Sequence, residues 1–252
     1  MRANILLAIR CIDLTTLEPD DTPGKVRGLA GTALRPVVDD DAVGPVAALC
    51  TWTHLAGEAA QALEGSDVAV ASVAGDFPAG LATTDVKVRE IEAALAEGAH
   101  EIDTVLNRRS FLDGDDEAVY EELVSLREAS GSAILKVILE TGELQDLASI
   151  RRASLIALVA GADFIKSSTG KSTPGATPEA AVVMCDAIKD FYATTARAAG
   201  LKVAGGIRTA EDALLYMHIV RRVLGDAWLN PDRFRIGASS LLNDFVSRLE
   251  GS

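Results

Sequence analysis

Eight short apolar segments, most of them followed by a helical pattern, recur along the 252 residues and constrain the fold more than any other feature. Segments of this length and composition are typical of buried strands, and the stretches between them carry apolar residues at helical spacing. The predicted strands occupy residues 11–17, 46–50, 67–73, 101–106, 134–140, 161–171, 201–206 and 233–237. The predicted helices occupy residues 56–63, 84–97, 117–129, 144–160, 178–199 and 210–224, with a short capping helix in the first dozen residues and a last helix opening at 241–242.

Strands that alternate with helices in a chain of this size predict a parallel barrel. The equivalent strand-end residues lie 26 to 37 positions apart, and they are Asp13, Cys50, Asp76, Asp103, Glu140, Lys166, Lys202 and Gly237. This spacing is close to the ~30 residues that eight units in roughly 250 residues imply. A doubly wound open sheet is the alternative, but it gives no reason for eight units of this size. We therefore expect one (β/α)8 barrel domain over residues 1–252.

Charge and cysteine usage exclude several classes of partner. The chain carries 37 Asp and Glu against 24 Lys and Arg, a formal charge of −13, so neither nucleic acid nor an anionic membrane is an expected partner. Three widely spaced cysteines (Cys11, Cys50 and Cys185) form neither a disulfide framework nor a metal-binding spacing, which suits a cytoplasmic protein. The apolar run 5–9 is too short for a membrane span and lacks a cleavage site for export.

Alternation along the strands separates an apolar row from a row that carries ionisable groups. The apolar row is expected to face the helices, so the second row projects into the barrel and contains Asp103, Lys136, Glu140, Lys166 and Lys202. Each unpaired ion there would cost several kcal/mol, so we interpret these groups as a mutually compensating set. Such a set at the C-terminal ends of barrel strands is typical of a catalytic site.

Lys166 is the candidate nucleophile of this set. A solvated lysine has a pKa of about 10.4, so only roughly one in 2500 is a free amine at neutral pH. Burial beside a second cation lowers that pKa, and Lys202 on the neighbouring strand would supply the cation. Lys166 would attack an aldehyde or ketone to form a Schiff base, with Lys202 and Asp103 transferring protons. The alternatives are a strand-end lysine that reaches water, and a structural ion pair between Lys202 and Asp103 or Glu140.

Three glycine-containing loops follow the last three predicted strands and suit phosphate. They are Gly170-Lys171, Gly205-Gly-Ile-Arg208 and Gly237-Ala-Ser-Ser240. Glycines let backbone amides approach an anion, a helix N-terminus adds partial positive charge, and this fold usually binds phosphate in the loops after strands seven and eight. A single Gly-Gly pair would be an ordinary turn, but three loops in this order predict an anion site.

Five segments carry a resemblance to a known family: 13–17, 135–144, 161–171, 202–213 and 235–242. They closely resemble class I deoxyribose-phosphate aldolase, and the similarity runs from about residue 10 to residue 245. The resemblance implies reversible cleavage of 2-deoxy-D-ribose 5-phosphate to D-glyceraldehyde 3-phosphate and acetaldehyde, in deoxyribose phosphate catabolism, with no cofactor and no metal.

The resemblance also implies roles for individual residues. It assigns Lys166 to the Schiff base and Asp103 and Lys202 to proton transfer. It places a further group in the phosphate-side pocket, namely Gly170, Lys171, Gly205, Gly206, Arg208, Gly237 and Ser239, and it implies supporting roles for Asp13, Cys50, Lys136 and Thr169.

Two departures from the family pattern bear on the reaction. Some members end in a tyrosine that assists proton transfer, whereas residues 248–252 here contain none, so we expect Asp103, Lys202 and water to suffice. A proline is common after the position of Cys50, but Thr51-Trp-Thr53 stands here and is expected to reshape the aldehyde side. Cys50 itself is either a target for reactive enals or a buried small apolar residue.

Two other functions stay open at the level of sequence. One is a Schiff-base aldolase that prefers unphosphorylated or longer aldehydes. The other is a sugar-phosphate-binding barrel without catalysis, against which the presence of Lys166, Lys202 and Asp103 argues. The expected partners are a small sugar phosphate and aldehydes, and a homodimer is compatible with the sequence without being dictated by it.

Overall fold

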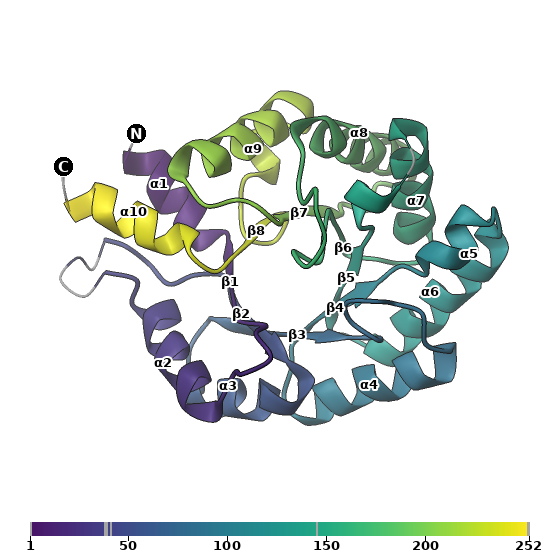
Figure 1. Cartoon of the computed structure of the whole chain (residues 1–252). Coiled ribbons are helices and arrows are strands. Elements are labelled where there is room, and N and C mark those ends of the chain that lie inside the picture. The colour runs from purple at the N-terminus through teal and green to yellow at the C-terminus, as the bar shows by residue number, and fades with distance from the viewer. Residues whose placement is uncertain (1, 38–39, 41, 145, 251–252) are drawn as a thin grey trace.

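Eight parallel strands form a closed barrel, as the sequence predicts. The computed structural model describes residues 2–37, 40, 42–144 and 146–250. The strands follow one another around the barrel in chain order, and the last pairs with the first (Figure 1). Their bounds are β1 Ile12–Thr15, β2 Ala48–Trp52, β3 Ala69–Ala74, β4 Glu101–Val105, β5 Ile134–Ile138, β6 Phe164–Lys166, β7 Gly200–Ala204 and β8 Phe234–Ala238.

Helices surround the barrel on its outside (Figure 1). They are α1 Arg2–Arg10, α2 Pro23–Leu34, α3 Ala56–Ala62, α4 Thr84–Ala96, α5 Arg108–Leu112, α6 Asp116–Ser130, α7 Leu147–Val159, α8 Pro178–Thr195, α9 Ala210–Val223 and α10 Leu241–Glu250, with short 3-10 turns η1 Thr53–Leu55, η2 Thr141–Glu143 and η3 Asp226–Trp228. The expected N-terminal helix is α1, which contacts α9 and α10. In the described part of the chain, no helix is both long and apolar enough to cross a membrane.

Two helices were absent from the prediction, and each has a local cause. Helix α2 contains three glycines, which weaken a helical pattern, but Thr22 caps its first turn and Pro23 occupies a position where no N–H is needed. Helix α5 has five residues, too few for a hydrophobic period. Helix α8 ends four residues earlier than predicted, because Ala196 adopts a left-handed backbone with φ 56°.

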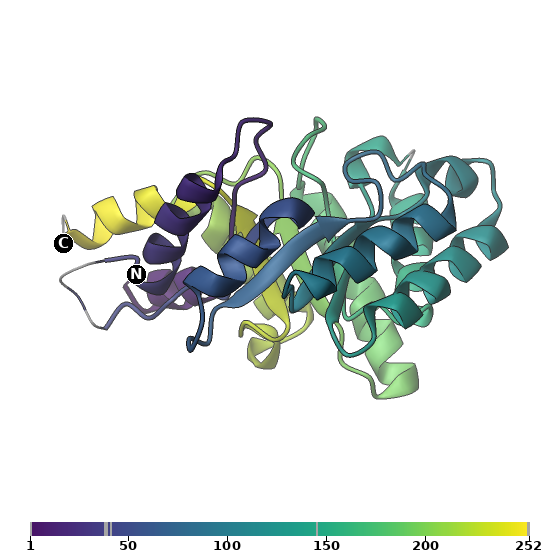
Figure 2. The same ribbon diagram turned by 90° about the horizontal axis from the view of Figure 1, so that it is seen from below.

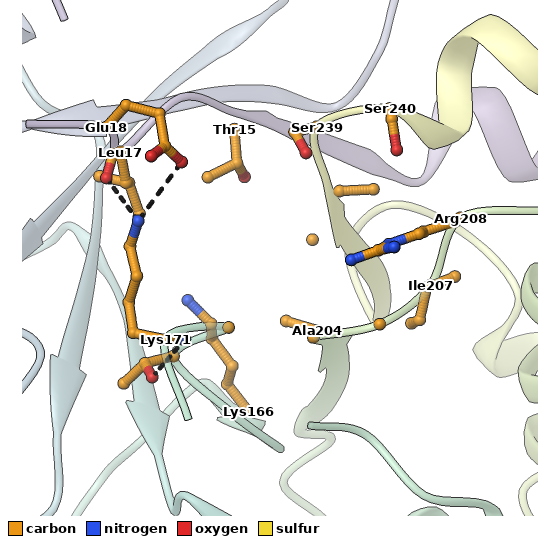
Figure 3. A pocket seen from close by; sticks show the side chains of 16 residues that line it. Thr15, Leu17, Glu18, Lys166, Lys171, Ala204, Ile207, Arg208, Ser239 and Ser240 are labelled. Atoms are coloured by element: carbon orange, nitrogen blue, oxygen red, sulfur yellow. Dashed lines mark hydrogen bonds and ion pairs between the residues drawn. The ribbon is translucent and has the colours of Figure 1, made fainter. Parts of the chain in front are cut away.

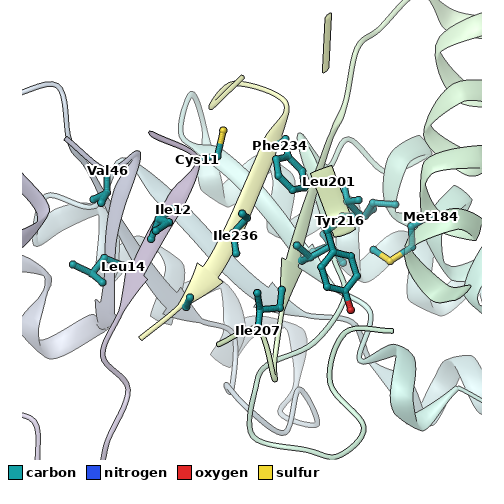
Figure 4. Close-up of a cluster of buried hydrophobic side chains, with 14 of the residues drawn as sticks. Cys11, Ile12, Leu14, Val46, Met184, Leu201, Ile207, Tyr216, Phe234 and Ile236 are labelled. Carbon is teal, nitrogen blue, oxygen red and sulfur yellow. The ribbon is translucent and has the colours of Figure 1, made fainter. Parts of the chain in front are cut away.

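The main core lies between the barrel and the helices. As alternation predicts, Leu135, Val137 and Leu201 face outward into it. Figure 4 shows Ile236 of β8 in the same layer, with Met184 of α8 among its helical members. This arrangement leaves the other face of each strand for the interior of the barrel.

The interior of the barrel is divided in character. Strands β2 and β3 contribute Ala48, Cys50, Ala71 and Val73, which form a small apolar cluster with Leu17. The remaining strands supply buried charged residues. In Figure 2 the β1–α2 loop, in dark purple, and the β6–α8 loop, in green, rise from one end of the barrel. These loops follow strand C-termini, so this end is where the fold places its active sites.

Candidate active site

Three lysines converge on the carboxylate of Asp103. Asp103 Oδ2 accepts hydrogen bonds from Lys166 Nζ at 2.7 Å and from Lys202 Nζ at 2.7 Å, and Oδ1 accepts from Lys136 Nζ at 2.9 Å. The register explains the meeting, because Asp103 lies opposite Lys136 in the β4–β5 pair and Lys166 lies opposite Lys202 in the β6–β7 pair. The Nζ atoms of Lys166 and Lys202 share one oxygen, so they lie within twice the 2.7 Å distance of each other.

A second tier of ion pairs surrounds this centre. Lys136 Nζ also lies 2.6 Å from Glu101 and 3.3 Å from Asp13. Arg235 bridges the same two carboxylates, donating from Nη1 to Asp13 at 2.7 Å and from Nη2 to Glu101 at 2.8 Å. Lys202 completes the tier through Asp13. We call the buried set the lumen network, and its members are Asp13, Glu101, Asp103, Lys136, Lys166, Lys202 and Arg235.

The sequence prediction of this set was partly wrong. Glu140 does not join it, because its carboxylate accepts hydrogen bonds from the backbone N–H and hydroxyl of Thr169 instead. Glu140 lies beyond the end of β5 with a left-handed backbone, φ 54°, so the alternation used to place it no longer applies. Asp76 likewise lies beyond β3, where it accepts from two backbone N–H groups of its own turn.

Glu101 and Arg235 were missing from the predicted site. Both could have been found by the alternation that found the others, since Glu101 lies two residues before Asp103 and Arg235 two residues before Gly237. Both lie toward the N-terminal ends of their strands, away from the end where this fold places catalytic residues.

The surroundings of the two lysines push their pKa values in opposite directions. Burial lowers the pKa of Lys166, and the positive charge of Lys202 lowers it further, although Asp103 opposes both. Burial also acts to lower the pKa of Lys202, but Asp103 and Asp13 outweigh burial and raise it. The lowering by Lys202 has the sign that the sequence predicted, but burial is the larger cause. Lys202 therefore stays cationic while Lys166 loses its proton more easily.

Asp103 is the hub of this arrangement. Burial works to raise the pKa of its carboxyl, but Lys136, Lys166 and Lys202 outweigh that effect and hold the pKa well below its usual range. Asp103 is therefore a carboxylate at neutral pH. It can accept a proton from one partner and return it to another, which is the property that a relay requires.

Gly237 makes room for one of these lysines. A Cβ atom at position 237 would lie 3.1 Å from Cε of Lys202 and 3.0 Å from Cβ of Ala204. Both distances are shorter than ordinary van der Waals contact, so a larger residue would displace the lysine. The absence of a side chain at Gly237 on β8 thus leaves space for the side chain of Lys202 on β7.

A cavity of about 280 Å³ opens beside Lys166 (Figure 3). It gathers all seven residues predicted for the phosphate side. The lining consists of Thr15, Leu17, Glu18, Lys166, Thr169, Gly170, Lys171, Ala204, Gly205, Gly206, Ile207, Arg208, Gly237, Ala238, Ser239 and Ser240. The loops after β6, β7 and β8 therefore meet around one space, as their order in the sequence predicts.

The far side of this cavity has the features of an anion site. Gly205 and Gly206 both have positive φ, 90° and 85°, which favours glycine. Ser239 and Ser240 stand just before α10, whose N-terminus carries partial positive charge. Figure 3 shows Arg208 extending toward the cavity, and within the described residues its guanidinium has no hydrogen-bond or ion-pair partner.

Lys171 lies elsewhere in the cavity than its assignment suggests. Its Nζ donates to the Leu17 carbonyl at 2.7 Å and lies 3.4 Å from Glu18 Oε1, so it reaches the β1–α2 loop (Figure 3). Thr169 Oγ1 accepts from the Lys171 backbone N–H at 3.0 Å. Lys171 therefore links the two loops over the barrel, and the anion side of the cavity is left to Arg208.

The ring of Phe77 lies near the Lys166 amine and packs against a second aromatic ring. The Nζ of Lys166 lies 5.9 Å from the ring centre of Phe77, and Trp52 meets Phe77 edge to face. Of the unusual Thr51-Trp-Thr53 segment, Trp52 is thus the residue that contacts Phe77 through its ring. Cys50 is fully buried in the apolar cluster, and burial raises the pKa of its thiol, which favours the interpretation as a buried small residue.

The fold and this site define a class of protein. A (β/α)8 barrel with a lysine pair on one aspartate, beside a glycine-lined cavity, has the architecture of a lysine-dependent aldolase. Residues 7–247 match the family described as DeoC/LacD family aldolase, and the chain belongs to that family.

Individual relatives agree with this placement. The chain is 46% identical to the deoxyribose-phosphate aldolase of Mus musculus, covering 97% of this chain and 80% of that protein. It is 42% identical to the deoxyribose-phosphate aldolase of Agrobacterium fabrum, covering 97% of this chain and 91% of that protein. A solved tetrameric deoxyribose phosphate aldolase from Aeropyrum pernix superposes with a TM-score of 0.75 at 30% identity, covering 97% and 91% of the two chains.

Proposed function

We propose that this protein is a class I aldolase that reversibly cleaves 2-deoxy-D-ribose 5-phosphate to D-glyceraldehyde 3-phosphate and acetaldehyde. The observation that carries the proposal is the pair of amines of Lys166 and Lys202 on one oxygen of Asp103, beside the cavity. One amine has a lowered pKa and the other a raised pKa, which separates a nucleophile from a proton donor.

The first half of the reaction joins enzyme and sugar. The free amine of Lys166 adds to C1 of the open-chain sugar, and the resulting carbinolamine loses water to give an iminium. Water leaves only after its oxygen is protonated, and Lys202 is the cation positioned to give that proton. The nitrogen of Lys166 loses one proton as the carbinolamine forms. Asp103, which contacts both nitrogens, accepts that proton and passes it to Lys202 after Lys202 has protonated the leaving water.

The second half breaks the carbon–carbon bond. A base removes the proton of the C3 hydroxyl, the C2–C3 bond breaks, and its electrons flow into the iminium to leave an enamine and D-glyceraldehyde 3-phosphate. The enamine carbon is then protonated, and water hydrolyses the new iminium to acetaldehyde and free Lys166. Asp103, Lys202 and water supply these proton transfers, since Asp103 is a carboxylate beside a cation.

The wider assignment follows the same proposal. The phosphate lies against Gly205, Gly206, Ser239 and Arg208, whose amides and guanidinium hold an anion in a chain of charge −13. The chemistry runs on lysine and carboxylate groups, so we propose a metal-independent enzyme that acts in deoxyribose phosphate catabolism in the cytoplasm. Residues 1–252 act as one barrel domain, and a homodimer is the first oligomer to test.

Reductive trapping tests the Schiff base directly. Incubation with acetaldehyde and borohydride should convert Lys166 to an ethylated lysine, detected by mass spectrometry of its peptide. The exposed Lys189 on α8 is the internal control for nonspecific labelling. Trapping at another lysine in preference to Lys166, or a failure to release acetaldehyde from the sugar phosphate, would reject the proposal and favour a binding barrel without catalysis.

The phosphate assignment has its own test. Arg208→Met should raise KM for deoxyribose 5-phosphate by about 10- to 100-fold, since a hydrogen bond to a charged group contributes ~1.5–3 kcal/mol. Activity on free deoxyribose should be unchanged. Arg221→Met on α9, where the arginine pairs with Asp226, is the matched control. Equal loss on both sugars would point to an aldolase for unphosphorylated aldehydes.

A further inference from the structure

The lumen network holds unequal numbers of positive and negative side chains. Its carboxylates are Asp13, Glu101 and Asp103, and its basic groups are Lys136, Lys166, Lys202 and Arg235. The inventory extends around the barrel, because among the described residues β3 directs no ionisable group inward and β2 contributes only Cys50. Burial raises the pKa of the Cys50 thiol, which keeps it neutral. The described lumen thus has one basic group more than it has carboxylates.

A buried set with a net charge is costly, so the seven groups favour the loss of one proton. The geometry indicates which group loses it. Lys136 contacts three carboxylates, Lys202 contacts two, and Lys166 contacts Asp103 alone among the described carboxylates. Arg235 contacts two carboxylates, and a guanidinium does not deprotonate in proteins. Lys166 therefore has the least electrostatic reason to remain an ammonium.

Several contacts hold the side chain of Arg235 in place. It is 4% exposed, its Nε donates to the Pro231 carbonyl, and its guanidinium lies 5.6 Å from the ring centre of Phe164. Its two terminal nitrogens bind Asp13 and Glu101. Without Arg235, those two carboxylates together with Asp103 would neutralise the three lysines in full.

We propose that Arg235 is a positioning residue that sets the charge state of Lys166, because its permanent positive charge occupies carboxylate capacity that would otherwise keep Lys166 protonated. The catalytic consequence rests on the proposed function. The electrostatic statement does not, since it concerns only how many carboxylates the lumen offers to its lysines. Removing the charge of Arg235 should therefore change the charge state of Lys166, even though the two side chains share no direct contact in the network.

The test compares variants that change the excess of basic groups over carboxylates in the lumen network in opposite directions. Arg235→Met leaves three lysines on three carboxylates, and Glu101→Gln leaves four basic groups on two. The double variant restores an excess of one. Arg235→Lys keeps the charge but loses the two-pronged contact. Methylation of Lys166 by formaldehyde and cyanoborohydride, followed by mass spectrometry across a pH series, measures the free amine in each protein whether or not the protein cleaves a sugar.

We expect the pH midpoint of methylation at Lys166 to rise by about one unit or more in Arg235→Met, a tenfold loss of free amine at neutral pH. The midpoint should fall in Glu101→Gln, return to near the wild-type value in the double variant, and stay there in Arg235→Lys. The rising limb of the pH profile of kcat/KM should shift among the four variants in the same order as the methylation midpoints. A structural role alone would lower activity in all four without ordered movement of the midpoint.

Two results would overturn the inference. One is a folded Arg235→Met protein with the wild-type midpoint, and the other is movement of both single variants in the same direction. If Arg235→Met fails to fold, the double variant compared with Glu101→Gln measures the same loss of the arginine charge. Methylation at Lys166 that follows the predicted order, together with absent acetaldehyde trapping, would leave this inference standing while rejecting the proposed function.

Discussion

Two buried lysines in this protein have opposite surroundings. Lys87 on α4 lies 2.6 Å from Glu122 on α6, and both side chains are buried outside the barrel wall. That lysine has a carboxylate to itself, while Asn107 lies 3.4 Å from the other Glu122 oxygen. Lys166, inside the barrel, shares its single carboxylate with Lys136 and Lys202.

The comparison shows that burial alone does not prepare a lysine for nucleophilic attack. A carboxylate that pairs with one lysine alone favours the ammonium form of that lysine. When several cations share one carboxylate, the amine with the fewest carboxylate contacts loses its proton most easily. The pair between α4 and α6 joins two helices, and the lumen network prepares chemistry. The following changes test this difference, beginning with the largest expected effect.

Lys166→Met should abolish cleavage, with kcat reduced by at least about 10⁴-fold, because no other lysine of the described chain both contacts Asp103 and lines the cavity. Acetaldehyde trapping should vanish with it. The substitution removes the surplus basic group, so the protein should remain folded, as circular dichroism and thermal unfolding can check. Residual activity above that level would mean that Lys202 or Lys136 can act as nucleophile.

Lys87→Met should act on stability and leave the chemistry alone. Removing the partner of buried Glu122 should lower the free energy of unfolding by about 3–5 kcal/mol, measured by urea denaturation. The double variant with Glu122→Leu should recover most of that loss. Below the unfolding temperature, the pH profile of kcat/KM should match the wild type, and a shifted profile would contradict the separation of the two clusters.

Lys202→Met should slow the reaction by about 100-fold or more and also move its pH dependence. The lowered pKa of Lys166 means that wild-type activity rises with pH through a midpoint below the ordinary lysine value. Without the charge of Lys202 that pKa rises, so the rising limb should move toward alkaline pH. Lys189→Met, at an exposed site, should leave the limb unchanged.

Gly237→Ala should have the smallest effect of the four. The added Cβ presses on Lys202 and Ala204, so we expect a loss of about 1–3 kcal/mol in stability and a decrease in kcat of about tenfold. The matched control is Gly31→Ala, an exposed helical position with nothing within 4 Å, which should stabilise the protein by ~0.5–1 kcal/mol. Unchanged kcat in Gly237→Ala would show that Lys202 tolerates displacement.

Much of the fold could be predicted from local pattern. The eight strands follow from short apolar runs, and the inward and outward rows of β5 follow from the alternation of Lys136 with Leu135 and Val137. Prediction failed where the local signal was weak or reversed. Helix α2 depends on its cap and on packing that override its glycines, and the turn after β5 re-aims Glu140 through a left-handed residue.

The site could be predicted only in part. Lys166, Lys202 and Asp103 were identifiable because a charged residue at the end of a buried strand is costly unless it serves a site. Their ion-pair partners were harder to predict from the sequence. The contact between Lys202 and Asp13 joins residues 189 positions apart, and whether two such side chains meet depends on strand register around the whole barrel.

The sequence by itself determined that this chain forms a barrel of eight units and directs lysines and carboxylates to the inside, because periodicity and residue type are local properties. Only the tertiary structure decided how many carboxylates each lysine meets. The number of carboxylates separates Lys166 from Lys136, and the sharing of Asp103 with two other lysines separates Lys166 from Lys87. Both depend on which strands and helices become neighbours, because Coulomb interactions act across space and not along the chain.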